Sequence, residues 1–291
     1  MARVGRQLQP PGLDQSAEGL GRIVNLMKHQ LIGRIKAALH QNDGAAAALL
    51  LTLAHSVHAV VLGMDRGVKG HVGQIHILPA AVLAGANGKS VSNYDKRYRG
   101  FTTLREAITD SINIVTVKTL AQVGVSLGWQ YVQEYGFTTV DSRDMNEALA
   151  LGGITQGVSN LELTAAYAAI ANQGTYIKPK FYTKILDHDG NVLIDNTTPE
   201  SHTVIKDTTA WLLTSAMEDV MTSGTGTSAY FGSSMAQAGK SGTTTSSRDA
   251  LFAGYTPYYT CAVWGGYDDN AMQKGSDTNY PKRIWKAVMK R

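Results

Sequence analysis

The run Lys240–Thr243 has the residue types that could bind a peptide carboxylate next to a reacting carbonyl. On a strand, the Lys240 ammonium is a fixed positive charge, and the Ser241 hydroxyl can donate a hydrogen bond to the same anion. Gly242 has no side chain, so a ligand backbone can lie close to the strand. The N–H of Thr243 can then point at a carbonyl as half of an oxyanion hole. Alone, the run is a weak signal, because an exposed strand lysine is the ordinary alternative.

A second polar group, Ser111-Ile112-Asn113, lies far earlier in the chain. Thr103 and Glu106 have the spacing of a capping box, which opens a helix. The apolar helical pattern that follows breaks at Asp110-Ser111 and resumes from Asn113. We therefore expect Ser111 and Asn113 at a joint between two helices, where side chains can point into a cleft.

Helices and strands are both predicted after residue 88. Ser159 and Glu162 form a second capping box at the start of an Ala-rich helix, and Asp207 is expected to cap a third helix. The two helices are predicted at Leu161–Asn172 and from Asp207 to about Met221.

Short apolar runs predict the strands. Phe181–Leu186 and Val192–Ile194 flank an Asp-Gly turn, which is typical of a hairpin. Three later runs predict an antiparallel meander with Lys240 on its first strand: Met235–Thr244, Ala250–Tyr255 and Tyr259–Tyr267. An antiparallel sheet with flanking helices is the α+β class.

The composition sets limits on the class of protein. With 291 residues, 43% of them apolar, the chain is long enough to bury a sizeable core. The net charge of +4 is spread out without a run of five basic residues, so nucleic acid is not expected as a partner. Cys261 is the single cysteine, which excludes an internal disulfide, and we expect it to be a small core residue.

Aromatic residues divide the chain into two parts. The 4 Trp, 13 Tyr and 5 Phe all lie at or after Tyr94. A packed domain rarely lacks such large side chains. We therefore predict that residues 1–87 are an unassigned segment of foreign composition and that residues 88–291 form a domain.

Within the first part, Gly44–Met64 contains no Asp, Glu, Lys or Arg and is long enough to cross a bilayer. A membrane anchor is one interpretation. An Ala- and Leu-rich helix in water, or sequence that does not fold, is the other, because His55, Ser56 and His58 would place polar groups in hydrocarbon.

The histidines of the first part do not have the spacing of a metal site. They lack the neighbouring glutamate or cysteine of the usual zinc motifs, so neither a metal nor another cofactor is predicted. The four considered, out of six histidines in this part, are His55, His58, His71 and His76.

Ser111-Ile112-Asn113 and Lys240-Ser241-Gly242 are similar to the S-D-N and K-T-G motifs of penicillin-interacting enzymes. Over about residues 88–291 the chain resembles the transpeptidase domain of class A penicillin-binding proteins. Further collinear motifs carry this resemblance: Asn93-Tyr94-Asp95, Tyr98-Arg99-Gly100, Thr103–Ala107, Ala150–Gly153, Gly157–Ser159, Leu163–Tyr167, Gly239–Thr244, Phe252–Tyr255 and Trp264–Tyr267. The resemblance implies an incomplete penicillin-binding-protein/β-lactamase-like transpeptidase fold.

The resemblance also implies a function and a set of site residues. It implies a serine-type D-alanyl-D-alanine transpeptidase that cross-links peptidoglycan stem peptides at the outer face of the cell membrane and is a target of β-lactams. Ser111 would relay a proton between the active-site lysine and the leaving group, and Asn113 would hold the substrate amide. Lys240 and Ser241 would bind the terminal carboxylate, and Thr243 would supply an oxyanion N–H.

The chain departs from the family at the nucleophile. No serine is followed three residues later by lysine, so S-x-x-K is missing. The family spacing places the nucleophile near residues 51–61, where Ser56 is a weak candidate, with Ala59 at the lysine position.

Four interpretations stay open. The chain could be an inactive fragment joined to foreign N-terminal sequence. It could be a pseudoenzyme that binds stem peptides or β-lactams without turnover. It could be an enzyme that uses Ser56, or a membrane or scaffold protein unrelated to acyl transfer.

Overall fold

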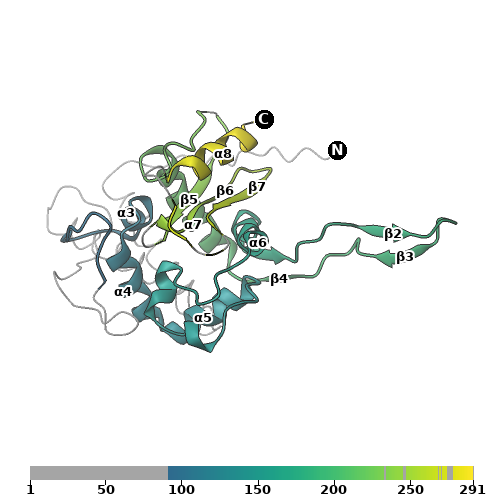
Figure 1. Cartoon of the computed structure of the whole chain (residues 1–291), viewed down its shortest axis with the longest axis horizontal. Helices are drawn as coiled ribbons and strands as arrows, with labels where there is room; N and C mark the ends of the chain where they lie inside the picture. Colours follow the sequence, from purple (N-terminus) through teal and green to yellow (C-terminus); the bar gives the residue numbers. More distant parts are fainter. Residues whose placement is uncertain are drawn as a thin grey trace, which may run out of the picture.

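The computed structural model describes residues 91–232, 234–244, 247–267, 269, 271–273 and 278–290. The segment 1–87 lies outside these residues, and with it the candidate span 44–64, the candidate nucleophile Ser56 and the histidines at positions 55, 58, 71 and 76. The described part has the predicted α+β class, with helices around an antiparallel sheet (Figure 1). None of its helices is both long and apolar enough to span a bilayer.

The predicted joint between two helices is confirmed. The first helix is α3 (Leu104–Thr109), and the second is α4 (Asn113–Val123), which α5 (Val125–Glu134) follows. The Thr103 hydroxyl accepts a hydrogen bond from the Glu106 N–H over 3.0 Å and so caps α3. Ser111 stands between α3 and α4 with a left-handed φ of 57°, which turns the chain sharply.

The Ala-rich helix is α6 (Asn160–Ala171). Both halves of its capping box form, between Ser159 and Glu162. Its inner face buries three alanines, Ala165, Ala166 and Ala169. Small side chains allow close approach, and α6 contacts β7 of the sheet, α7 and β1. Two short 3-10 helices, η2 (Ser142–Asp144) and η3 (Glu147–Leu151), precede it.

The third predicted helix is α7 (Asp207–Thr222), but its predicted cap is wrong. The capping position is Lys206, which makes no side-chain cap, and Asp207 is already the first helical residue. The Asp207 carboxylate instead accepts from the N–H of Thr208. A carboxylate in the first turn still stabilises a helix, because it faces the positive end of the helix dipole.

The predicted meander is present as a three-stranded antiparallel sheet of order β5-β6-β7. Its strands are β5 (Ala238–Thr243), β6 (Ala250–Tyr255) and β7 (Thr260–Gly265). Lys240 lies on the first strand, opposite Ala253. The sequence analysis did not predict α8 (Tyr280–Met289), which packs on β6 and β7.

The core on the α8 side of the sheet centres on Trp285. This residue is fully buried, and its ring meets Phe252 edge-on at 5.2 Å between centroids. Its indole N–H donates to the Cys261 carbonyl over 3.1 Å. Cys261 is half-buried beside this cluster, and burial raises the pKa of its thiol, as suits a core residue.

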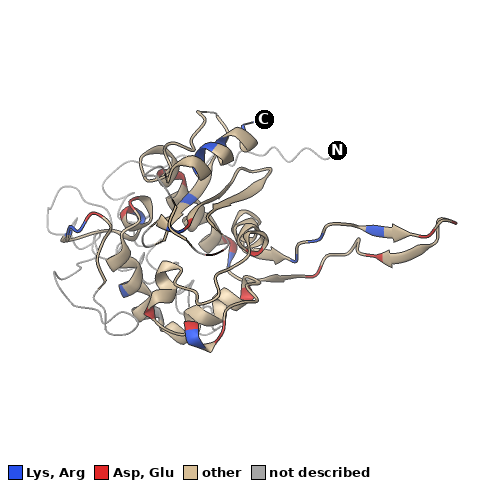
Figure 2. Ribbon diagram, viewed as in Figure 1, with Lys and Arg blue, Asp and Glu red and all other residues tan. Residues whose placement is uncertain are grey.

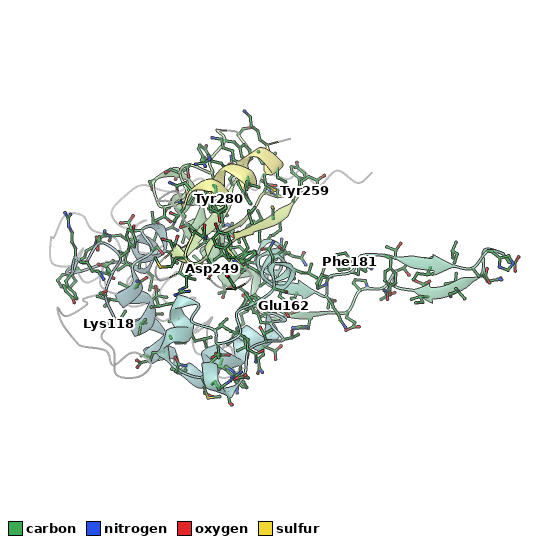
Figure 3. The ribbon with its side chains drawn as sticks, in the orientation of Figure 1. Lys118, Glu162, Phe181, Asp249, Tyr259 and Tyr280 are labelled. Carbon is green, nitrogen blue, oxygen red and sulfur yellow. The ribbon has the colours of Figure 1, made fainter. Side chains whose placement is uncertain are left out.

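The predicted hairpin projects from the body as a long arm (Figure 1). It consists of β2 (Lys184–Leu186) and β3 (Val192–Asp195), and a second pair, β1 (Thr175–Ile177) and β4 (Ser201–Thr203), joins it to the body. Charges of opposite sign face each other along the arm (Figure 2), with ion pairs Lys178–Glu200 at 3.0 Å and Lys184–Asp195 at 3.5 Å. Phe181 lies exposed at its base (Figure 3).

Candidate functional site

Two of the predicted site residues meet directly. The Lys240 ammonium on β5 donates to the Ser111 hydroxyl at the α3–α4 joint over 2.8 Å. The left-handed turn at Ser111 takes this residue out of both helices, and the strand fixes Lys240 opposite it. Two groups with different chemistry are thus in contact. The Ser111 hydroxyl could relay protons, and the Lys240 ammonium could bind an anion.

The Lys240 charge is held in a desolvated position. Burial, together with the nearby cation of Lys282, lowers the pKa of Lys240 to about 8. A second hydrogen bond runs from the ammonium to the Ser241 carbonyl over 3.0 Å. Within the described ranges, none of the ion pairs includes Lys240. Its charge is therefore free to attract an anionic ligand.

Ser241 is bound to a residue that the sequence analysis missed. Its hydroxyl donates to the Thr225 hydroxyl over 2.8 Å. Thr225 lies in the turn between α7 and the sheet, and its own N–H donates to the Thr109 carbonyl at the end of α3 over 3.2 Å. One signal in the sequence could have pointed to it. Thr225 is a polar residue between two glycines, Gly224 and Gly226, and it precedes the strand that carries the Lys240 motif.

Asn113 is held by a segment that comes 21 residues earlier in the sequence and lies beside it in the fold. As the first residue of α4, it donates from its side-chain amide to the Ser92 carbonyl over 3.0 Å. The neighbouring Asn93 is buried and accepts from the Ile114 N–H over 3.1 Å. Residues 92 and 93 thus lie against the start of α4, and the Asn113 amide is engaged by the protein itself.

Gly242 and Thr243 occupy the end of β5. A Cβ at Gly242 would meet only the Leu251 side chain, at 3.5 Å, which is an ordinary contact. At Gly239, by contrast, a Cβ would come within 2.8 Å of Phe252. The fold therefore needs glycine at Gly239 for packing, whereas a Cβ could be accommodated at Gly242. Thr243 is exposed at the strand end, opposite Ala250.

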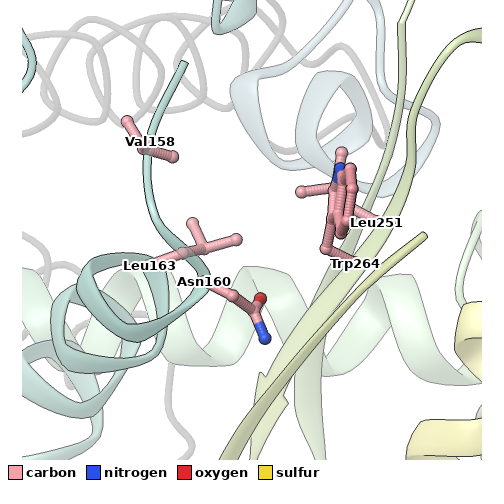
Figure 4. Close-up of a pocket in the computed structure, with 5 residues that line it drawn as sticks. All are labelled: Val158, Asn160, Leu163, Leu251 and Trp264. Carbon is pink, nitrogen blue, oxygen red and sulfur yellow. The ribbon is translucent and has the colours of Figure 1, made fainter. Parts of the chain in front are cut away.

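A groove lies beside this strand end, between the start of α6 and the sheet (Figure 4). Leu251 and Trp264 are cross-strand partners on one wall, in register with Gly242. The groove encloses about 190 Å³, less than the roughly 300 Å³ of a small ligand pocket. Val158, Asn160 and Leu163 complete the lining. Its size suits one apolar side chain of a peptide.

The described residues contain no cluster of three His, Cys, Asp or Glu side chains that could hold a metal ion. What the site offers is a desolvated cation, hydroxyls and an open strand end. These groups suit recognition of an anionic peptide terminus.

Comparison with known proteins places the chain beside one family. The model of the penicillin-binding protein transpeptidase domain matches residues 58–290, starting before the first motif of the resemblance. Penicillin-binding protein 1F of Bacillus subtilis is 33% identical over 291 residues, covering 96% of this chain and 39% of the relative. Penicillin-binding protein 1A of Clostridium acetobutylicum is 36% identical over 210 residues, covering 71% of this chain and 26% of the relative.

Solved structures share the fold. Penicillin-binding protein PonA1 from Mycobacterium tuberculosis superposes with a TM-score of 0.65 at 22% identity, over 85% of this chain and 65% of that one. Penicillin-binding protein 1A from Haemophilus influenzae gives a TM-score of 0.58 at 23% identity, over 74% of this chain and 38% of that one. The described residues thus have the penicillin-binding-protein transpeptidase fold.

Proposed function

The chain belongs to the penicillin-binding protein transpeptidase domain family, and from that premise we propose that its site binds the C-terminal carboxylate of a peptidoglycan stem peptide ending in D-alanyl-D-alanine. The observation that carries the proposal is the 2.8 Å contact between the Lys240 ammonium and the Ser111 hydroxyl. It supports the proposal because it sets a cation with no ion-pair partner in the described residues beside a second polar group of the family motifs.

Each site residue has a proposed role. Lys240 and Ser241 bind the terminal carboxylate, and Gly242 lets the peptide backbone lie along β5. Thr243 donates its N–H to the carbonyl of the scissile peptide, or of a β-lactam. Asn113 would bind the substrate amide after releasing the Ser92 carbonyl, and Ser111 would relay a proton toward the leaving group.

Acyl transfer needs a nucleophile that this sequence does not supply through S-x-x-K. In the family reaction, a serine Oγ–carbonyl bond forms, the D-Ala–D-Ala amide breaks, and the leaving amine takes a proton. Without the serine and its lysine, an oxyanion donor and a binding site leave a small remnant of the rate. We therefore propose that the chain does not cross-link stem peptides.

Binding without cross-linking would make the chain a binding pseudoenzyme, and a fragment that neither binds nor cross-links is the second candidate. The pseudoenzyme is supported by the hydrogen-bonded set of Lys240, Ser111, Ser241 and Thr225, which is assembled although S-x-x-K is missing. The inactive fragment and the pseudoenzyme differ in whether ligand binding persists. The chain spans 39% and 26% of the lengths of the two relatives described above, so the activities of the whole relatives are proposals for it.

Calorimetric titration with a diacetyl-lysyl-D-alanyl-D-alanine peptide tests binding. Lys240→Ala should weaken binding by roughly 10- to 100-fold, since hydrogen bonds to charged groups contribute about 1.5–3 kcal/mol. Lys178→Ala, at an exposed lysine of the arm, is the matched control and should change nothing. Equal loss in both variants, or no binding by the unmodified chain, would refute the proposal.

Fluorescent penicillin tests the absence of acyl transfer. We expect no covalent label on the chain after denaturation. A label that disappears in Ser56→Ala would instead establish Ser56 as a nucleophile.

The proposed location, the outer face of the cell membrane, follows from the family. Anchoring through residues 44–64 is a separate proposal. Membrane fractionation of a chain that lacks these residues would test it.

A further inference from the structure

We propose that Thr225 is a positioning residue that makes the site prefer a peptide carboxylate over a neutral carboxamide. It would do so by orienting the hydroxyl of Ser241. The inference rests on the proposed function, because it assigns to Thr225 a part in the same carboxylate site. Thr225 belongs to neither of the two motifs that predicted that site.

The turn that carries Thr225 is held firmly against two helices. Thr225 donates its N–H to the Thr109 carbonyl over 3.2 Å, and Gly226 donates to the Val220 carbonyl over 2.9 Å. A Cβ at Gly224 would come within 2.3 Å of the Thr109 carbonyl oxygen, so only glycine fits at this position of the turn. These contacts place the Thr225 hydroxyl between the end of α3 and β5.

The helix that precedes the turn is fixed to α3 as well. Arg105 of α3 donates to the Asp219 carboxylate over 2.7 Å and to the Ser215 carbonyl over 2.9 Å. Thr109 and Ser111 lie four and six positions after Arg105 in the chain. The turn, the Ser111 joint and β5 therefore form one braced unit around the Lys240 ammonium.

The role of Thr225 follows from the number of hydrogen-bond donors and acceptors on the Ser241 and Thr225 hydroxyls. A hydroxyl has one O–H to donate and two lone pairs to accept. In the unliganded chain the Ser241 O–H points to Thr225. When a carboxylate binds, the Ser241 O–H must turn to it, and the Thr225 O–H can then donate to the Ser241 oxygen.

This rearrangement favours an anion specifically. The chain Thr225 to Ser241 to carboxylate lines up two O–H donors in one direction, and each bond strengthens the next. A carboxamide terminus presents N–H donors on one side and carries no charge, so it gains less from a site of donors. Thr225 therefore contributes to discrimination as well as to affinity.

The test compares two peptides, diacetyl-lysyl-D-alanyl-D-alanine and its C-terminal carboxamide. Thr225→Val keeps the branched shape but removes the O–H and leaves the Ser241 oxygen without its donor. We expect carboxylate binding to weaken by about 10-fold while carboxamide binding changes little, within the range for one hydrogen bond to a charged ligand. Thr225→Ser should restore the wild-type ratio of the two affinities.

Controls separate this inference from the proposed function and from misfolding. Thr222→Val removes an exposed hydroxyl that donates within α7 to the Glu218 carbonyl, its one side-chain hydrogen bond among the described residues, and should leave the ratio unchanged. If Lys240→Ala weakens carboxylate binding but Thr225→Val leaves the ratio intact, the inference is overturned and the proposed function stands. If the unmodified chain binds neither peptide, both are overturned. A parallel fall in both affinities in Thr225→Val would show a purely structural role, and that also overturns the inference.

Discussion

The Lys240 ammonium and the Ser111 hydroxyl, 129 positions apart in sequence, lie 2.8 Å from each other. The contact joins the sheet to the helical part of the molecule at the point where α3 gives way to α4. Because Lys240 is partly desolvated there, its pKa is lowered toward neutral pH, and the charge of the site depends on pH in that range.

The lowered pKa of Lys240, to about 8, predicts how peptide binding changes with pH. Below pH 8 the ammonium is charged and binding is at full strength; above it the charge is lost and affinity falls, by up to 10-fold per pH unit. Calorimetric titrations between pH 6 and 10 measure this profile. Lys240→Arg should move the fall beyond that range, because arginine stays charged. A flat wild-type profile would show that Lys240 does not bind the carboxylate.

Lys240 is also predicted to destabilise the folded protein. Its folded pKa of about 8 lies below the ordinary 10.5, so the unfolded chain binds this proton more tightly. The free energy of unfolding should therefore rise as the pH increases from 8 to 10.5.

At pH 7 the cost is fully present, and Lys240→Met should raise the stability by about 1–2 kcal/mol. This is less than the whole pKa shift would give, because the side chain is partly exposed and solvent screens its charge. Urea unfolding at pH 7 and pH 10 measures both values. The advantage of the variant should shrink at pH 10; an equal advantage at both pH values would point to packing instead of charge.

The sequence predicted those parts of the fold that local rules determine. Spacing alone located the joint at Ser111, the capping box of Ser159 and Glu162, and Lys240 on the first strand of the meander, and the structure confirms all three. Caps and turns depend on neighbours within a few residues, so their signals survive in a single sequence.

Elements that depend on distant neighbours escaped prediction. The helix α8 contains Pro281 and charged residues and is stabilised by burying Trp285 against Phe252 of the sheet. The pairing of β1 with β4 joins segments separated by the whole arm. Thr225 was missed for the same reason, because its partners Ser241 and Thr109 come together only in the folded chain.

Gly224→Ala is predicted to destabilise the protein strongly. The added Cβ would lie 2.3 Å from the Thr109 carbonyl oxygen and 2.9 Å from the Val220 Cα, so backbone must shift at the end of α3. We expect a loss of about 2–4 kcal/mol in urea unfolding, within the range for overpacked sites. Gly100→Ala is the control, since a Cβ there meets nothing within 4 Å, and it should change stability by less than about 0.5 kcal/mol. Equal effects of the two substitutions would mean that the turn is not tightly packed.

Asp144 is predicted to hold together the segment before the groove. This carboxylate is fully buried and accepts from the Thr155 N–H over 2.7 Å, from the Thr155 hydroxyl over 2.6 Å and from the Asp141 N–H over 3.0 Å. The hydrogen bonds, that of the Thr155 hydroxyl first, hold the pKa of Asp144 below its ordinary 3.8. Its stabilisation is thus present above pH 3.8 and is lost as the pH falls through the folded pKa.

Asp144→Asn replaces one accepting oxygen with an N–H₂ group that faces another donor, and we expect a loss of about 2–3 kcal/mol at pH 7. The matched control is Asp189→Asn, at the exposed tip of the arm, which should change stability by less than about 0.5 kcal/mol. Urea unfolding at pH 7 and pH 3 tests both. The deficit of Asp144→Asn should narrow at pH 3, because part of the wild-type stabilisation is then lost. A deficit of the same size at both pH values would mean that Asp144 acts through its shape and not through its charge.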